Sequence, residues 1–159
     1  MNINIVAVGK VKEKFLKDGI KEYEKRLIPY CRLNIIEVME EIAPAEVTHG
    51  EREAILKKEG ERILKILKPQ SFKVVLSIEG ERFTSESMAE KIEKLMLSGI
   101  SDFSFIIGGS LGLSDEVKKS ADLILSFSDF TFPHQLVRLI LLEQIYRWIK
   151  IIKKEPYHK

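Results

Sequence analysis

Short apolar runs alternate along the chain with longer stretches in which apolar residues recur at helical spacing. The apolar runs predict five strands, at residues 2–8, 33–38, 72–78, 103–107 and 123–127. Between and after them, amphipathic stretches predict helices at 15–27, 52–67, 88–96, a short one after Ser114, and 133–153. Regular alternation of strand and helix predicts an α/β fold with a mostly parallel sheet of five to six strands and helices on both faces. We expect one domain over residues 1–159.

The last predicted helix is apolar around nearly its whole circumference. Pro133 suits its first turn, and Thr131 is a candidate cap. A helix with so thin a polar stripe cannot cover a sheet on one side and face water on the other. We therefore predict a symmetric homodimer through the C-terminal helix. The alternative is a central helix inside a monomeric core.

Two strand ends in the last third of the chain are candidates for a ligand site. The fourth strand runs into Gly108 and Gly109, and the fifth ends in a loop of residues 127–133. In open α/β sheets, ligands bind at the carboxyl ends of strands, and the glycines could take positive φ and expose the backbone to a ligand. The alternative is that they only turn the chain.

The sequence lacks the motifs that are typical of several kinds of functional site, which argues against those sites. The Gly108–Gly112 segment has neither dinucleotide-binding glycine spacing nor a phosphate-loop lysine, and no G-x-S-x-G pattern surrounds Ser110. The chain has no C-x-x-C and no histidine pair at metal spacing, so we expect no metal. His49 and His134 are interpreted as a surface residue and a structural residue.

Composition describes an ordinary soluble protein, 45% hydrophobic and 31% charged, with a net charge of +2. No apolar run is long enough to cross a membrane, and the N-terminus lacks the basic region of a signal peptide. The single cysteine excludes an internal disulfide, so we expect a cytoplasmic protein without membrane association. Residues 133–159 carry six Lys or Arg against two Glu, a weak electrostatic indication of nucleic acid. A solvated helix end explains these charges equally well.

The C-terminal tail combines three functional groups directly after the basic helix. Tyr157 can stack on a base, His158 can take a proton near neutral pH, and Lys159 can meet a phosphate. The alternative is an ordinary frayed terminus.

Several segments in this order resemble the RlmH family, also called YbeA-like, over the whole chain. They are residues 5–10, 23–27, 105–110, 125–128, 131–135, 143–147 and 156–158. Members are small SPOUT-class methyltransferases that act on large-subunit ribosomal RNA. The resemblance implies homodimers, a C-terminal trefoil knot that is an exception to unknotted topology, and methylation of N3 of a pseudouridine in 23S rRNA.

The resemblance also implies the site residues. S-adenosylmethionine would be held by Leu76, Gly108, Phe127, Ser128, Asp129, Phe130, Thr131 and Phe132. Catalytic and base contacts would come from Arg147, Tyr157 and His158, with the partner subunit as a candidate source.

The predicted mechanism is in-line transfer of the methyl group to a base nitrogen that loses its proton. Arg147 and Tyr157 would orient a flipped base, and His158 or a neighbouring group would assist proton removal. We expect an assembled ribosome as substrate, because the protein is small and offers little basic surface. The alternatives are a non-catalytic ribosome-associated RNA-binding dimer and a flavodoxin-like nucleotide or flavin binder.

Overall fold

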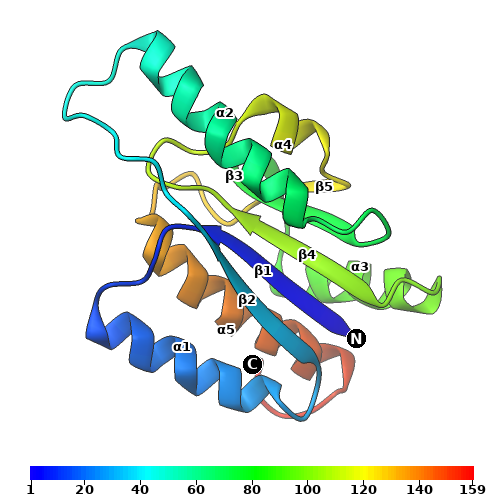
Figure 1. The fold of residues 1–159 in the computed structure, drawn as a ribbon. Helices are drawn as coiled ribbons and strands as arrows, with labels where there is room; N and C mark the ends of the chain where they lie inside the picture. Colours follow the sequence, from blue (N-terminus) through cyan, green and yellow to red (C-terminus); the bar gives the residue numbers. More distant parts are fainter.

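A computed structural model describes residues 1–159 and contains one five-stranded parallel sheet (Figure 1). Its strands follow the order β2-β1-β4-β3-β5, and every neighbouring pair is parallel. The strands are β1 Asn2–Val8, β2 Arg32–Val38, β3 Phe72–Arg82, β4 Asp102–Ile107 and β5 Leu123–Ser126. The predicted α/β fold with a parallel sheet is confirmed.

Helices cover both faces of this sheet. They are α1 Lys14–Leu27, α2 His49–Ile66, α3 Ser85–Leu97, α4 Asp115–Lys119 and α5 His134–Ile152. Helices α2 and α4 lie together on one face, whereas α5 lies on the other face between α1 and α3 (Figure 1). None of these helices is long and apolar enough to cross a lipid bilayer.

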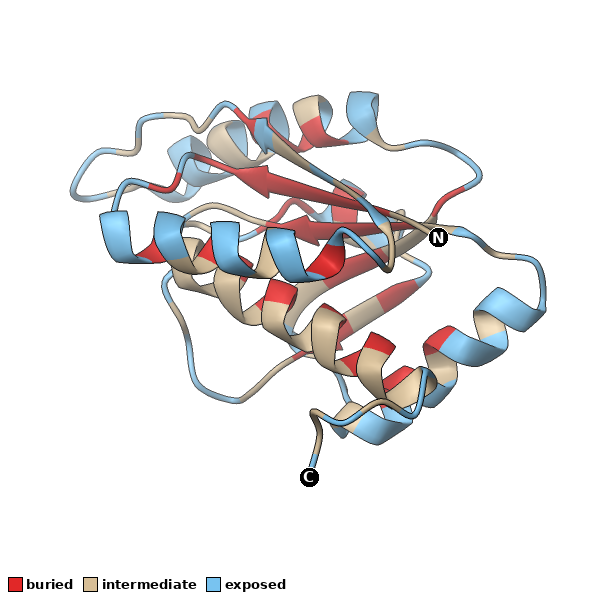
Figure 2. Ribbon diagram, turned by 90° about the horizontal axis from the view of Figure 1, so that it is seen from below, coloured by how far each residue is buried: buried red, intermediate tan, exposed pale blue.

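The two central strands, β1 and β4, are buried along almost their whole length because a different helical layer covers each face (Figure 2). Along β1, Ile3, Ile5 and Ala7 belong to the larger core beneath α1, α3 and α5. Val6 and Val8 point the other way, into a smaller core under α2 and α4. All five side chains are at most 2% exposed. Successive side chains of a strand point to opposite faces, so residues 5–8 enter the larger and the smaller core alternately.

Helix α5 is covered by its own chain more completely than its sequence suggested. No residue of the helix is exposed, because α1 and α3 flank it and the sheet lies beneath it. Its apolar circumference is thus partly explained within one chain, and the homodimer stays a prediction. The predicted Thr131 cap is wrong, because no side chain caps α5. The helix begins at His134, so Pro133 is the residue before its first turn and does not lie in that turn as predicted.

Strand β3 continues beyond its predicted end at residue 78. Its pairing with β5 is interrupted between Leu76 and Glu81, then resumes at Glu81 and Arg82. Gly80 permits this return, since a Cβ there would lie 2.7 Å from backbone atoms of Ile124 and Leu125. Residues 77–80 consequently stand out from the sheet beside its carboxyl edge. The trefoil knot implied by the resemblance stays a prediction.

Candidate cofactor and active site

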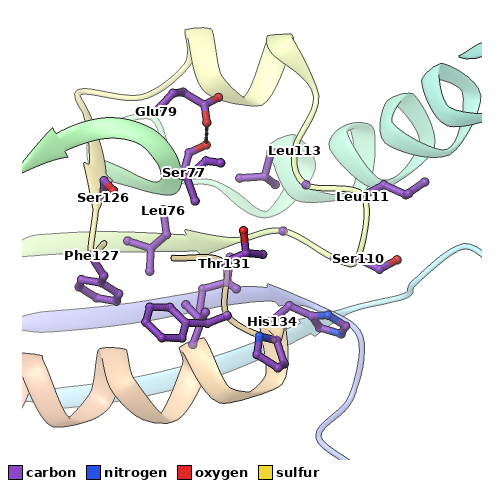
Figure 3. A pocket seen from close by; sticks show the side chains of 18 of the residues that line it. Leu76, Ser77, Glu79, Ser110, Leu111, Leu113, Ser126, Phe127, Thr131 and His134 are labelled. Atoms are coloured by element: carbon purple, nitrogen blue, oxygen red, sulfur yellow. Dashed lines mark hydrogen bonds between the residues drawn. The ribbon is translucent and has the colours of Figure 1, made fainter. Parts of the chain in front are cut away.

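A cavity of about 770 Å³ lies at the carboxyl edge of the sheet, where β3, β4 and β5 end (Figure 3). Seven of the eight residues predicted to hold the cofactor line it, namely Leu76, Gly108, Phe127, Ser128, Phe130, Thr131 and Phe132. The eighth, Asp129, does not line it; its carboxylate pairs with Arg82 at the surface. The strand ends far apart in sequence therefore meet at one open site.

The glycine corner of the cavity depends on close backbone approach. A Cβ on Gly108 would lie 2.6 Å from the carbonyl oxygen of Gly112, closer than real Cβ contacts allow. Neither Gly108 nor Gly109 uses the positive φ that glycine permits; the positive φ of this loop, +89°, is at Gly112. The corner leaves main-chain atoms of residues 108 and 109 facing the cavity without side chains between.

Charged groups of both signs line the same cavity. Lys118 and the Ser77 hydroxyl donate to the Glu79 carboxylate and lower its pKa to about 2, Lys118 contributing most. Arg52 of α2 reaches across, and its Nη2 donates to the Leu111 carbonyl at 3.0 Å. A ligand with both a cationic and an anionic group would find partners here.

Sequence reasoning missed Glu79, Arg52 and Lys118. The one signal in the sequence was that Glu79 follows an apolar run, as a strand-end residue does. Arg52 lies on α2 and Lys118 on α4, the two helices on the face of the sheet opposite α5. No local sequence pattern connects either residue to the site. His134, predicted to be structural, lines the cavity with Nε2 4.0 Å from Glu40 Oε1.

The predicted catalytic residues come together in a second cluster, on the outer side of α5. Glu143 Oε1 accepts bonds from Arg147 Nε and from the Tyr157 hydroxyl, each at 3.1 Å. His158 lies beside them, with Nδ1 3.2 Å from Arg147 Nη1 and Nε2 2.8 Å from Glu86 Oε1. The tail is therefore docked on the helix.

Tyrosines and cations extend this cluster. All four tyrosines of the chain meet there, Tyr146 contacting Tyr23, Tyr30 and Tyr157 edge to face. The Tyr30 hydroxyl donates to Glu155 at 2.6 Å, which fastens the start of the tail. The Arg147 guanidinium lies over the Tyr157 ring, 4.9 Å from its centre.

This environment fixes the protonation of two of the predicted catalytic groups. Burial, with hydrogen bonds to Tyr23 and Glu143, raises the pKa of Tyr157 well above its usual range. The hydrogen bond to Glu143 raises the pKa of Arg147. Both groups are protonated at neutral pH, so they can donate hydrogen bonds but cannot accept a substrate proton.

The two clusters do not meet within one chain. Neither Arg147, Tyr157 nor His158 lines the 770 Å³ cavity. No three His, Cys, Asp or Glu side chains gather where they could hold a metal ion. The structure thus holds a ligand cavity and, apart from it, a docked tail with proton donors and an imidazole.

Comparison with known proteins finds one family over almost the whole chain. Residues 1–158 match the family model described as "Predicted SPOUT methyltransferase". A ribosomal RNA large subunit methyltransferase H of Carboxydothermus hydrogenoformans is 57% identical over 159 residues, covering 100% of both chains. The protein of the same name from Acetivibrio thermocellus is 54% identical, with the same coverage.

Solved structures resemble the fold at low sequence identity. A "probable methylase family protein" from Haemophilus influenzae superposes with a TM-score of 0.54 at 12% identity. The match covers 99% of this chain and 70% of that one. At this identity the likeness concerns the fold alone.

Proposed function

Because the chain belongs to the SPOUT methyltransferase family, we propose that it methylates large-subunit ribosomal RNA with S-adenosylmethionine as methyl donor. The observation that carries this proposal is the cavity at the carboxyl edge, lined by seven of the eight residues expected to hold that donor. Relatives with 57% and 54% identity over the full length carry the name of this activity. The proposed place of action is the cytoplasm.

The residues present fit the donor. Gly108 exposes main-chain atoms where a Cβ could not stand, while Leu76 and Phe127 offer apolar surface. Glu79, Arg52 and Lys118 supply charges of both signs, as an amino acid moiety with an ammonium and a carboxylate requires. When bound, S-adenosylmethionine supplies an electrophilic methyl group on a sulfonium.

In detail, we propose N3 of a pseudouridine in 23S rRNA as the acceptor, on an assembled ribosome. Arg147 and Tyr157, both protonated, would donate hydrogen bonds that orient the base. N3 must lose its proton as it gains the methyl group, and the imidazole of His158 is the group of the tail that we propose accepts it. The Arg147 guanidinium can only donate a hydrogen bond, so Nδ1 of His158 is the nitrogen that accepts, and Nε2 carries the proton toward Glu86. Substrate binding would therefore first have to release Nδ1 from Arg147.

We also propose that the protein acts as a homodimer through α5. The docked tail covers the outward side of α5, and it does not line its own chain's cofactor cavity. In a two-fold pairing through this helix, the tail of one subunit would face the partner. Such a pairing would supply Arg147, Tyr157 and His158 to the partner's cavity.

The test is transfer of radiolabelled methyl from S-adenosylmethionine to 70S ribosomes, 50S subunits and naked rRNA lacking the modification. Nucleoside mass spectrometry then identifies the product. We expect label on a pseudouridine, most rapidly in 70S ribosomes. Ribosome binding without transfer to any of the three would contradict the proposal and favour a non-catalytic RNA-binding dimer.

A further inference from the structure

A second, smaller cavity adjoins the cofactor cavity. Its volume is about 270 Å³, and it lies between the start of α3, the middle of α5 and the end of β5. Leu125, Ser126, Phe127 and Phe132 line both cavities, so the two share one wall. We propose that this cavity receives the target nucleobase of the RNA, an inference that rests on the proposed methyltransferase function.

The lining suits a flat heteroaromatic ring. Three phenylalanines, Phe83, Phe127 and Phe132, surround the cavity together with Met88. Aromatic side chains hold unstacked bases in RNA-binding proteins because every base has a flat π-face. The volume is about a third of the neighbouring cavity's, which suits a single base rather than the whole cofactor.

The polar groups of the cavity suit an edge with adjacent donor and acceptor. Gln144 Oε1 accepts from the Ser85 hydroxyl at 3.1 Å, and Nε2 donates to Glu143 at 2.6 Å. An amide has two lone pairs and two N–H groups, so one of each remains for a ligand. Pseudouridine presents such a pair, N1–H and the C2 carbonyl, on the side of the ring that leaves N3 free for methylation.

Trp148 adds a separate observation. Its side chain lines the cavity and is 2% exposed, yet its indole Nε1 has no hydrogen-bond partner. Buried donors without partners are rare in proteins, because an unmade hydrogen bond costs free energy. A base carbonyl in the cavity is a candidate acceptor for this donor.

Two variants test the proposal in the full-length protein. Ser85→Leu fills the cavity, and Gln144→Leu removes the amide without changing side-chain size much. We expect kcat/KM for methylation of ribosomes to fall on the order of a hundredfold for the first and tenfold for the second. The affinity for S-adenosylhomocysteine, measured by calorimetry, should stay within about twofold, because the cofactor would occupy the other cavity.

Matched controls make the same chemical changes at exposed positions outside both cavities, as Ser101→Leu and Gln70→Leu. Both should keep wild-type kinetics, and circular dichroism with melting curves should show that all four variants fold. Full activity in folded Ser85→Leu would overturn the inference, and so would a parallel loss of cofactor affinity, which would assign the cavity to the cofactor. If the wild type itself transfers no methyl group, the proposed function fails instead.

Gln144 would also determine specificity. Uridine lacks the N1–H donor of pseudouridine, so the wild type should prefer ribosomes that carry pseudouridine at the target. In Gln144→Leu that preference should shrink on the order of tenfold. An undiminished preference would overturn the assignment of the base edge to Gln144.

Discussion

The missing side chain of Gly108 keeps the proposed cofactor cavity open. Gly108→Ala would place a methyl group 2.6 Å from a backbone oxygen that cannot move without the loop. We expect a loss of about 1–3 kcal/mol in unfolding free energy and a fall of at least tenfold in S-adenosylhomocysteine affinity. Denaturant titration and calorimetry measure the two effects.

The control for Gly108 is Gly50→Ala on α2, where a Cβ would meet nothing within 4 Å. Alanine is the better helix former, so this variant should gain about 0.5–1 kcal/mol and bind the ligand as the wild type does. Equal behaviour of the two variants would contradict the role of backbone crowding at Gly108.

Tyr157 makes stability depend on pH in the alkaline range. Above pH 10 an unfolded tyrosine ionises, whereas folded Tyr157 keeps its proton because burial raises its pKa. The folded state then binds more protons than the unfolded state, so stability falls as pH rises. Tyr157→Phe should flatten the fall in unfolding free energy between about pH 10 and pH 12. Denaturation at several pH values would show it, and an unchanged slope would refute it.

At the scale of elements, Arg138 fastens α5 to the strand ends beside the cofactor cavity. Its Nη1 donates a hydrogen bond to Glu37 Oε1 at 2.7 Å, and its Nη2 donates one to the Gly9 carbonyl at 3.0 Å. The side chain is 3% exposed, so these bonds are shielded from water. Arg138→Gln should lower the free energy of unfolding by roughly 1.5–3 kcal/mol, the range for hydrogen bonds to charged groups.

The matched control for Arg138 is Arg32→Gln on β2. Arg32 is exposed and makes no ion pair in the structure, so the change should stay within about 0.5 kcal/mol. Thermal or chemical denaturation of both variants measures the difference. A loss of similar size in the two would mean that the anchor of α5 lies elsewhere.

Strands and helices were predictable where burial makes apolar residues recur at the spacing of a strand or a helix. β1 matches its predicted range because it is buried on both faces and ends at Gly9. The start of α2 lies three residues earlier than predicted, although Thr48 and Glu51 form a capping box whose pattern is visible in the sequence. The extension of β3 was not predictable, since residues 79–82 are charged or glycine and the extension exists only through pairing with β5.

The candidate site was predictable only in part, for a physical reason. Residues of the 127–132 loop were found because they follow one another in the chain and resemble a family. The second cavity is lined by residues from the start of α3, the end of β5 and the middle of α5. Because these segments are far apart in sequence, no local sequence pattern predicts the cavity. In the sequence, Gln144 is one of several polar residues on an apolar helix. Only the fold brings it to Ser85 of α3, with which it forms a hydrogen bond.

At the scale of the whole molecule, the proposed dimer predicts a solution mass of twice the 18.3 kDa of the chain. Light scattering coupled to size-exclusion chromatography measures it directly. A mass of 18.3 kDa at micromolar concentration would contradict the dimer. The tail would then have to act within its own chain.

Mixed dimers test whether the tail acts on the partner. Gly108→Ala and His158→Ala should each abolish most methyl transfer as homodimers. Refolded together, they should recover roughly a quarter of wild-type activity, because half of the dimers are mixed and each holds one intact combination. Mixed dimers of wild type and His158→Ala serve as the reference, and no recovery would assign the tail to its own cavity.

Helix α5 follows all five strands in the sequence, and this order governs when the larger core can form during synthesis. Five residues of this helix, Leu141, Leu142, Ile145, Trp148 and Ile149, belong to the larger core, and the sheet pairs strands far apart in sequence. Such long-range contacts form slowly and leave apolar surface open until the last partner arrives. A nascent chain without α5 therefore exposes one face of its sheet to chaperones, and the larger core closes only after α5 has been synthesised.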